Sequence, residues 1–105
     1  MTTFLMLGRY SSEAIGRISA GRTKRVKELI TAQGGKALSM HALLGGYDLA
    51  FLVELPDTGA AIALSVTLAK ETGISFQSYQ AVDVAQFDKL VGARAKRPAR
   101  KKRNK

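Results

Sequence analysis

Leu43-Leu44-Gly45-Gly46-Tyr47-Asp48-Leu49-Ala50 joins two apolar stretches near the middle of the chain. The paired glycines can adopt positive φ, which a two-residue hairpin turn requires. Strands that flank such a turn pair antiparallel. The segment therefore predicts a β-hairpin made of residues 36–44 and 48–55, with the glycines at its tip.

Signals on both sides of this hairpin complete the expected order of elements. Residues 2–7, before Gly8, and residues 74–82 are apolar runs typical of strands. Helices are expected over 12–33 and 58–72, because each follows Ser or Asp capping residues and ends at glycine. The order βαββαβ predicts an α+β, ferredoxin-like fold with a four-stranded antiparallel sheet and two helices on one face.

Two features qualify this helix assignment. Gly16 and Gly21 weaken the first half of the first helix, so a kink or an irregular segment is expected before residue 20. After the last strand, residues 83–91 read as a short terminal helix, with Val84, Phe87 and Val91 on one face.

Strand alternation assigns residues to the two faces of the sheet. The face expected to pack on the helices holds Leu38, Met40, Ala42, Leu44, Leu49, Phe51, Val53 and Leu55. The other face is still apolar at Leu43, Leu52 and either Leu5 or Leu7, although a solvated face is usually polar. The second helix has no charge from Ala60 to Ala69, so little of it is expected to face water. We therefore expect a second subunit to cover the open face of the sheet.

Composition limits the class of protein. The chain has 105 residues, an apolar fraction of 46% and no cysteine, which fits one globular domain without disulfides or thiol chemistry. The net charge of +9 is concentrated near the C-terminus: residues 94–105 hold eight of the 17 basic residues. Residues 1–92 are expected to fold, and residues 93–105 to form a disordered basic tail. No signal peptide or membrane span is evident, so a cytoplasmic protein is expected.

The eight positive charges of the tail could make a weak, salt-sensitive contact with polyanions such as RNA, DNA or anionic membrane. The residues that would carry it are Arg97, Arg100, Lys101, Lys102 and Arg103. The alternative is a tail that only keeps the protein soluble. Sequence-specific RNA recognition by the sheet is rejected, because residues 48–54 lack the basic-glycine-aromatic signature of RNA-binding strands.

Four segments together resemble the GYD-domain family of the dimeric α/β-barrel superfamily, over about residues 1–90. They are Phe4-Leu5-Met6-Leu7-Gly8, Arg22-Thr23-Lys24 leading to Gly34-Gly35-Lys36, Leu44-Gly45-Gly46-Tyr47-Asp48, and Pro56-Asp57. The family often has an acidic or polar residue at the position of Gly46. The resemblance implies a ferredoxin-like subunit that dimerises sheet to sheet. Relatives in the wider superfamily include cofactor-free monooxygenases, haem enzymes and ligand-sensing domains, so a shared fold does not fix a shared chemistry.

His41 is the only histidine and is expected on the less apolar face of its strand, near Ser39. In a cavity it could act as a general base or bind haem iron. The alternative is a partly buried histidine with one hydrogen bond. One histidine and no cysteine exclude a multi-histidine metal site within one subunit.

Polar residues near the strand ends are candidate ligand-binding residues. They are Arg9, Arg22, Tyr47, Asp48, Glu54 and Tyr79. Each also has a structural alternative: Asp48 can cap the hairpin, Tyr47 can cover the strand ends, and Arg22 can pair with Asp48 or Glu54. Gln77 and Tyr79 alternate onto one face, which Glu54 could share.

The sequence thus predicts a homodimer or higher oligomer that binds a small molecule between sheet and helices or at the subunit interface, without a cofactor. One alternative is a cofactor-free oxygenase or isomerase that uses His41 and a tyrosine. The other is a protein that associates non-specifically with nucleic acid through its basic tail.

Overall fold

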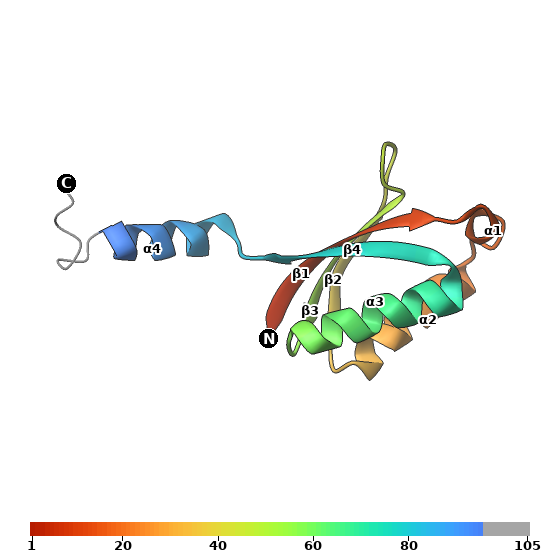
Figure 1. Ribbon diagram of the computed structural model, residues 1–105, viewed down its shortest axis with the longest axis horizontal. Coiled ribbons are helices and arrows are strands. Elements are labelled where there is room, and N and C mark those ends of the chain that lie inside the picture. Colours follow the sequence, from red (N-terminus) through yellow and green to blue (C-terminus); the bar gives the residue numbers. More distant parts are fainter. Residues whose placement is uncertain (96–105) are drawn as a thin grey trace.

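The computed structural model describes residues 1–95. Its elements in chain order are β1 (Thr2–Tyr10), α1 (Ser12–Ile15), α2 (Ala20–Ala32), β2 (Lys36–Ala42), β3 (Leu49–Leu55), α3 (Thr58–Thr72), β4 (Ile74–Ala81) and α4 (Val84–Ala95). The four strands form one sheet in the order β2-β3-β1-β4, and every neighbouring pair is antiparallel. Helices α2 and α3 lie on one side of this sheet (Figure 1). The predicted α+β, ferredoxin-like fold is confirmed.

The strand register places the core on the side of the helices. Phe4 pairs with Val53 and Met6 with Phe51, and all four side chains are buried. Phe51 therefore faces the helices as predicted, and its ring lies 5.1 Å from that of Phe76. The core cluster consists of Phe4, Met6, Val26, Leu29, Ile30, Phe51, Val53, Leu55, Ala61, Leu64 and Leu68. Burying this apolar surface is the main driving force for docking α2 and α3 on the sheet.

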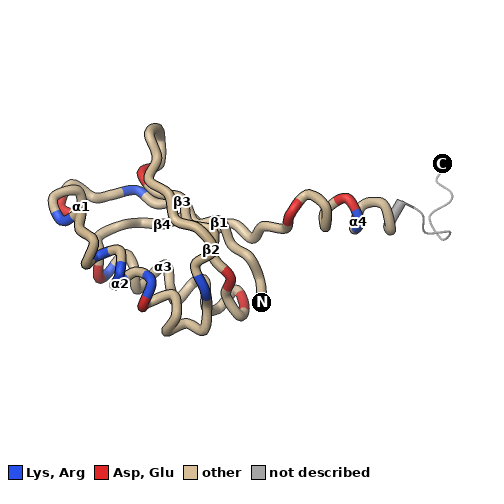
Figure 2. The backbone as a smooth tube through the Cα atoms, turned by 180° about the vertical axis from the view of Figure 1, so that it is seen from behind, with Lys and Arg blue, Asp and Glu red and all other residues tan. Residues whose placement is uncertain are grey.

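The opposite side of the sheet, here called the open face, carries the alternate residues of each strand. Across β3, β1 and β4 its central rows are Leu52–Leu5–Tyr79 and Ala50–Leu7–Gln77. No helix of the described chain lies on this face (Figure 1). Figure 2 shows that charged residues gather on α2, whereas β1 and β4 are almost free of them. An apolar sheet centre is thus left open in a single chain.

Strand β2 departs from the predicted alternation. A β-bulge lies between Ala37, which pairs with Val53, and Ser39, which pairs with Leu52. One extra residue in a strand shifts the following side chains to the other face. Ala37 therefore packs against the core together with Met40, while Leu38 is exposed. The prediction that Leu38 belongs to the core face was wrong for this reason.

The connection between β2 and β3 is longer than the predicted two-residue turn. It spans residues 43–48, and it stands out on the side of the sheet away from the helices (Figure 1). Only Gly45 of the glycine pair has positive φ, at 144°. Leu44, predicted to face the core, is fully exposed here. The antiparallel pairing is confirmed, but the tight turn and the strand bounds at residues 44 and 48 were wrong.

The first helical region is broken, as the glycines predicted. Helix α1 ends at Ile15, and α2 begins only at Ala20, where the Ser19 hydroxyl accepts a hydrogen bond from the Arg22 N–H. Strand β1 runs past Gly8 to Tyr10, three residues beyond the expected end at Leu7. A Cβ at Gly8 would lie 2.6 Å from the Phe76 ring. Gly8 therefore allows close packing within the strand rather than ending it.

A bidentate ion pair joins helices α2 and α3. The Nε and Nη2 atoms of Arg25 donate to the two carboxylate oxygens of Glu71 at 2.9 and 3.1 Å. Hydrogen bonding to Glu71 raises the pKa of Arg25, and Glu28 makes a smaller contribution. The pair is solvent-exposed, so it aligns the two helices more than it stabilises them.

Helix α3 has the predicted bounds, with Asp57 as N-cap and Gly73 at φ 72° as C-cap. Its outer side is more exposed than expected, because Ile62 and Val66 face solvent. Helix α4 is four residues longer than expected at its C-terminal end and points away from the rest of the chain (Figure 1). No helix within residues 1–95 is long and apolar enough to cross a membrane.

Candidate functional site

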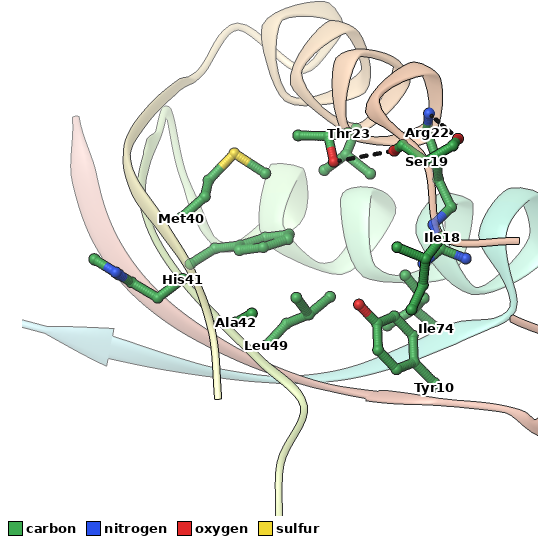
Figure 3. A pocket seen from close by; sticks show the side chains of 12 residues that line it. Tyr10, Ile18, Ser19, Arg22, Thr23, Met40, His41, Ala42, Leu49 and Ile74 are labelled. Atoms are coloured by element: carbon green, nitrogen blue, oxygen red, sulfur yellow. Dashed lines mark hydrogen bonds between the residues drawn. The ribbon is translucent and has the colours of Figure 1, made fainter. Parts of the chain in front are cut away.

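A cavity of about 250 Å³ lies between the N-terminal half of α2 and the core side of the sheet (Figure 3). We call it the α2 cavity. Its lining residues are Tyr10, Ile18, Ser19, Arg22, Thr23, Val26, Met40, His41, Ala42, Leu49, Phe51 and Ile74. Most of these side chains are apolar, so the cavity favours an apolar ligand body.

The break before α2 opens this cavity. Because the chain is not helical between Ile15 and Ala20, Ile18 stays exposed at the margin instead of closing onto the core. Ser19 then caps α2 and fixes the position of its first turn, which carries Arg22 and Thr23. The local irregularity of the chain is therefore what leaves the core side of β2 and β3 accessible at this end.

Arg22 supplies the positive charge of the α2 cavity. Its Nη1 donates to the carbonyl oxygen of Ala14, and its guanidinium lies over the Tyr10 ring, 5.1 Å from the centroid. A guanidinium has five N–H donors, so the bond to Ala14 leaves others for a ligand. Figure 3 shows Arg22, Ile18 and Tyr10 together on one side of the cavity, opposite Met40. Within the described residues, Arg22 makes these contacts rather than the alternative ion pair with Asp48 or Glu54.

A second cluster of polar groups lies on the open face. The guanidinium of Arg9 lies 4.7 Å from the centre of the Tyr47 ring. The hydroxyls of Tyr47 and Tyr79 both donate to Oε1 of Gln77, the latter at 2.9 Å. Predicted residues Arg9, Tyr47 and Tyr79 are thus brought together. The two hydroxyls share one acceptor on Gln77 and the Arg9 guanidinium stacks on the Tyr47 ring, so the cluster forms a brace between the hairpin and β4.

The Gly46-Tyr47-Asp48 triplet anchors the hairpin to β1. The N–H of Asp48 donates to the Gly8 carbonyl and its carbonyl accepts from the Leu43 N–H, both at 2.8 Å. Its Oδ2 accepts from the N–H of Tyr10 at 2.9 Å, where β3 no longer pairs with β1. Asp48 therefore holds the strand segment that carries Arg9 toward one face and Tyr10 toward the other.

Similarity to a known family covers most of the chain. The family model of the GYD domain matches residues 4–91. The chain belongs to the GYD-domain family. No curated protein and no solved structure matches the chain. The matched range covers β1 through most of α4, and so includes both the α2 cavity and the brace on the open face.

His41 of this GYD domain lies on the edge strand β2, in one cross-strand row with Ala50, Leu7 and Gln77. Three strand spacings separate His41 from Gln77, a distance of roughly 14 Å. Figure 3 shows the imidazole pointing away from the centre of the α2 cavity, although His41 is part of its lining. Within one chain, His41 is therefore separated from Tyr10 and from the tyrosines of the brace. Its catalytic role stays a prediction.

The remaining candidates lie elsewhere. Glu54 is on the open face as predicted, but it pairs with Thr3 and Lys36 at the far end of the sheet from Arg9. Among residues 1–95, no three His, Asp or Glu side chains gather in a way that could hold a metal ion. The predicted polyanion-binding residues Arg97, Arg100, Lys101, Lys102 and Arg103 lie outside the described residues.

The sequence did not single out Tyr10, Ile18, Met40 and Leu49 as lining residues of the α2 cavity. A signal for Tyr10 exists, because it has the same parity along β1 as the core residues Phe4 and Met6. Arg9 has the opposite parity. Strand alternation alone therefore places Tyr10 at the α2 cavity and Arg9 in the cluster on the open face.

Proposed function

We propose that this GYD-domain protein binds a small, mostly apolar acid in the α2 cavity. The observation that carries the proposal is a guanidinium placed on a mostly apolar cavity that opens to solvent. An apolar cavity of roughly 150 Å³ is large enough to hold benzene. A volume of about 250 Å³ therefore suits one aromatic ring, or a short aliphatic chain, with a carboxylate.

The lining supports this ligand class. Met40, Leu49, Phe51 and Ile74 offer an apolar surface from three strands, and methionine adapts readily to differently shaped ligands. Arg22 is held by Ala14 and Tyr10, so its charge is positioned before a ligand arrives. A carboxylate that accepts hydrogen bonds from this guanidinium would form the strong, charge-assisted type of pair.

The experiment is an NMR titration of the ¹⁵N-labelled protein with benzoate, with benzyl alcohol as the uncharged comparison. We expect benzoate to shift the amide signals of Tyr10, Arg22 and Leu49. Arg22→Gln is expected to weaken benzoate binding at least tenfold while changing benzyl alcohol binding little. Arg17→Gln is the matched control, because Arg17 is exposed and outside the cavity lining. Equal benzoate affinity in both variants, or shifts confined to the open face, would contradict the proposal.

We also propose that the protein is a homodimer in which two open faces meet. The supporting observation is the apolar centre of this face, formed by Leu5, Leu7 and Leu52. Facing sheets pack about 10 Å apart through such side chains. The test is the oligomeric state of Leu52→Asp, described at the end of the Discussion.

A further inference from the structure

Helix α4 carries an apolar stripe that has no partner in the described chain. Val84, Phe87, Leu90 and Val91 lie at helical spacing along one side, and each is between 45% and 72% exposed. The radius of gyration of 17.7 Å reflects this extension, since a compact chain of about 100 residues has roughly 13 Å. A monomeric protein rarely leaves such a stripe in water. We call these four residues the α4 stripe.

A matching apolar groove lies beside α3. Ile62 and Val66 form its exposed wall, and Phe4 and Phe76 form its floor. Its volume is about 250 Å³, and the remaining lining residues are Thr58, Ala61, Ser65 and Ser78. None of the eight lining residues is charged. We call this the α3 groove, and it suits an apolar helix face better than a charged one.

We propose that the α4 stripe packs into the α3 groove of a second copy of this chain, so that the two copies exchange their terminal helices. Asp83 fixes the direction in which α4 leaves the sheet. Its Oδ1 accepts from the Gln86 N–H, and its carbonyl accepts from the Phe87 N–H. The first turn therefore forms only two residues after β4 ends, and α4 points outward instead of folding back on its own α3 (Figure 1).

The area of the interface favours a second copy as the partner. Four strands spaced by about 4.8 Å and about seven residues long give an open face of roughly 450 Å², or about 900 Å² for two copies. Stable complexes usually bury about 1,200–2,000 Å². A 12-residue helix is about 18 Å long and 10 Å wide, so two exchanged helices and their grooves add roughly 700 Å². The sheets alone fall short of a standard interface, and the helices supply the difference.

This inference rests on the proposed homodimer and is independent of the α2 cavity. The absence of cysteine allows a direct test by disulfide cross-linking in the full-length chain. Phe87→Cys and Ile62→Cys are made in separate, differently tagged chains, which are expressed together and oxidised mildly. We expect a disulfide-linked dimer that contains one chain of each kind, because a disulfide forms only where the two Cα atoms come within about 7 Å of each other.

Lys89→Cys with Ile62→Cys is the matched control, because Lys89 lies on the side of α4 away from the stripe, and we expect at least tenfold less cross-linked product. Three results would overturn the exchange. They are Phe87→Cys joined only to itself, an intrachain disulfide in a chain that carries both Phe87→Cys and Ile62→Cys, and no mixed product from a sample that sedimentation shows to be dimeric. In the last case the homodimer would stand without the exchange. A wild-type monomer at micromolar concentration would instead overturn both the homodimer and the exchange.

Discussion

At the scale of single residues, Asp48, Arg9 and Tyr10 explain how the end of β1 contributes side chains to both faces of the sheet. Asp48 bonds to backbone groups of β1 and of the hairpin, and it stabilises the end of β1 after pairing with β3 has stopped. Arg9 and Tyr10 then point to opposite sides of the sheet. The sequence singled out Tyr47, Asp48, Arg9 and Arg22 as one set of ligand-binding candidates, and the structure places Arg22 at the α2 cavity and Arg9 with Tyr47 on the open face.

Replacing Asp48 by alanine should therefore destabilise the fold. We expect Asp48→Ala to lower the free energy of unfolding by about 1–3 kcal/mol, because the part-buried Tyr10 N–H loses its acceptor. Asp48→Asn keeps an acceptor oxygen and should cost less. Urea denaturation measures both values. Asp88→Ala, at an exposed position on α4, is the control and should stay within about 0.5 kcal/mol. Identical midpoints for Asp48→Ala and the control would argue against this role.

His41 offers a second test at this scale. Its side chain is exposed and points away from the centre of the α2 cavity (Figure 3). We therefore expect His41→Ala to leave both the unfolding midpoint and the benzoate affinity within twofold of wild type. NMR titration and urea denaturation provide the two values. A large loss of benzoate binding in His41→Ala would instead support the prediction that His41 acts at the ligand site.

At the scale of elements, caps and glycines could be read from the sequence, whereas changes of register could not. Asp57, Gly73 and the break before residue 20 follow from local backbone chemistry and were predicted correctly. The bulge near Leu38 depends on how β2 pairs with β3, so no local signal revealed it. The six-residue hairpin depends on the bonds of Asp48 to β1, which lies almost 40 residues away in the chain.

The N-cap residue Ser19 shapes the α2 cavity, because it fixes the position of the first turn of α2. Ser19→Ala removes the acceptor for the Arg22 N–H, and loss of such a cap usually costs about 1 kcal/mol. We expect this loss in the free energy of unfolding and, because Arg22 lies in the first turn, a weaker affinity for benzoate. Ser12→Ala, in the short helix α1, is the control. Unchanged benzoate affinity in a measurably destabilised Ser19→Ala protein would show that the first turn does not position the site.

At the scale of the whole molecule, the three proposals arise from surfaces that a single chain leaves unfilled. The α2 cavity exists because α2 starts late, and the open face and the α4 stripe are apolar without a cover in the described chain. The sequence predicted an apolar open face from Leu43, Leu52 and either Leu5 or Leu7. It could not predict the cavity, because the volume depends on how α2 docks over Met40 and Phe51.

The oligomeric state is the most direct test of this account. Native mass spectrometry of the full-length protein with benzoate measures the number of chains and the bound ligand together. We predict that the wild-type protein has the mass of two chains and carries one benzoate per chain. Arg22→Gln should remain dimeric and lose the benzoate, whereas Leu52→Asp should have the mass of one chain. Thr31→Asp, on the exposed outer side of α2, is the control and should behave as wild type. A bare wild-type monomer at micromolar concentration would contradict the account.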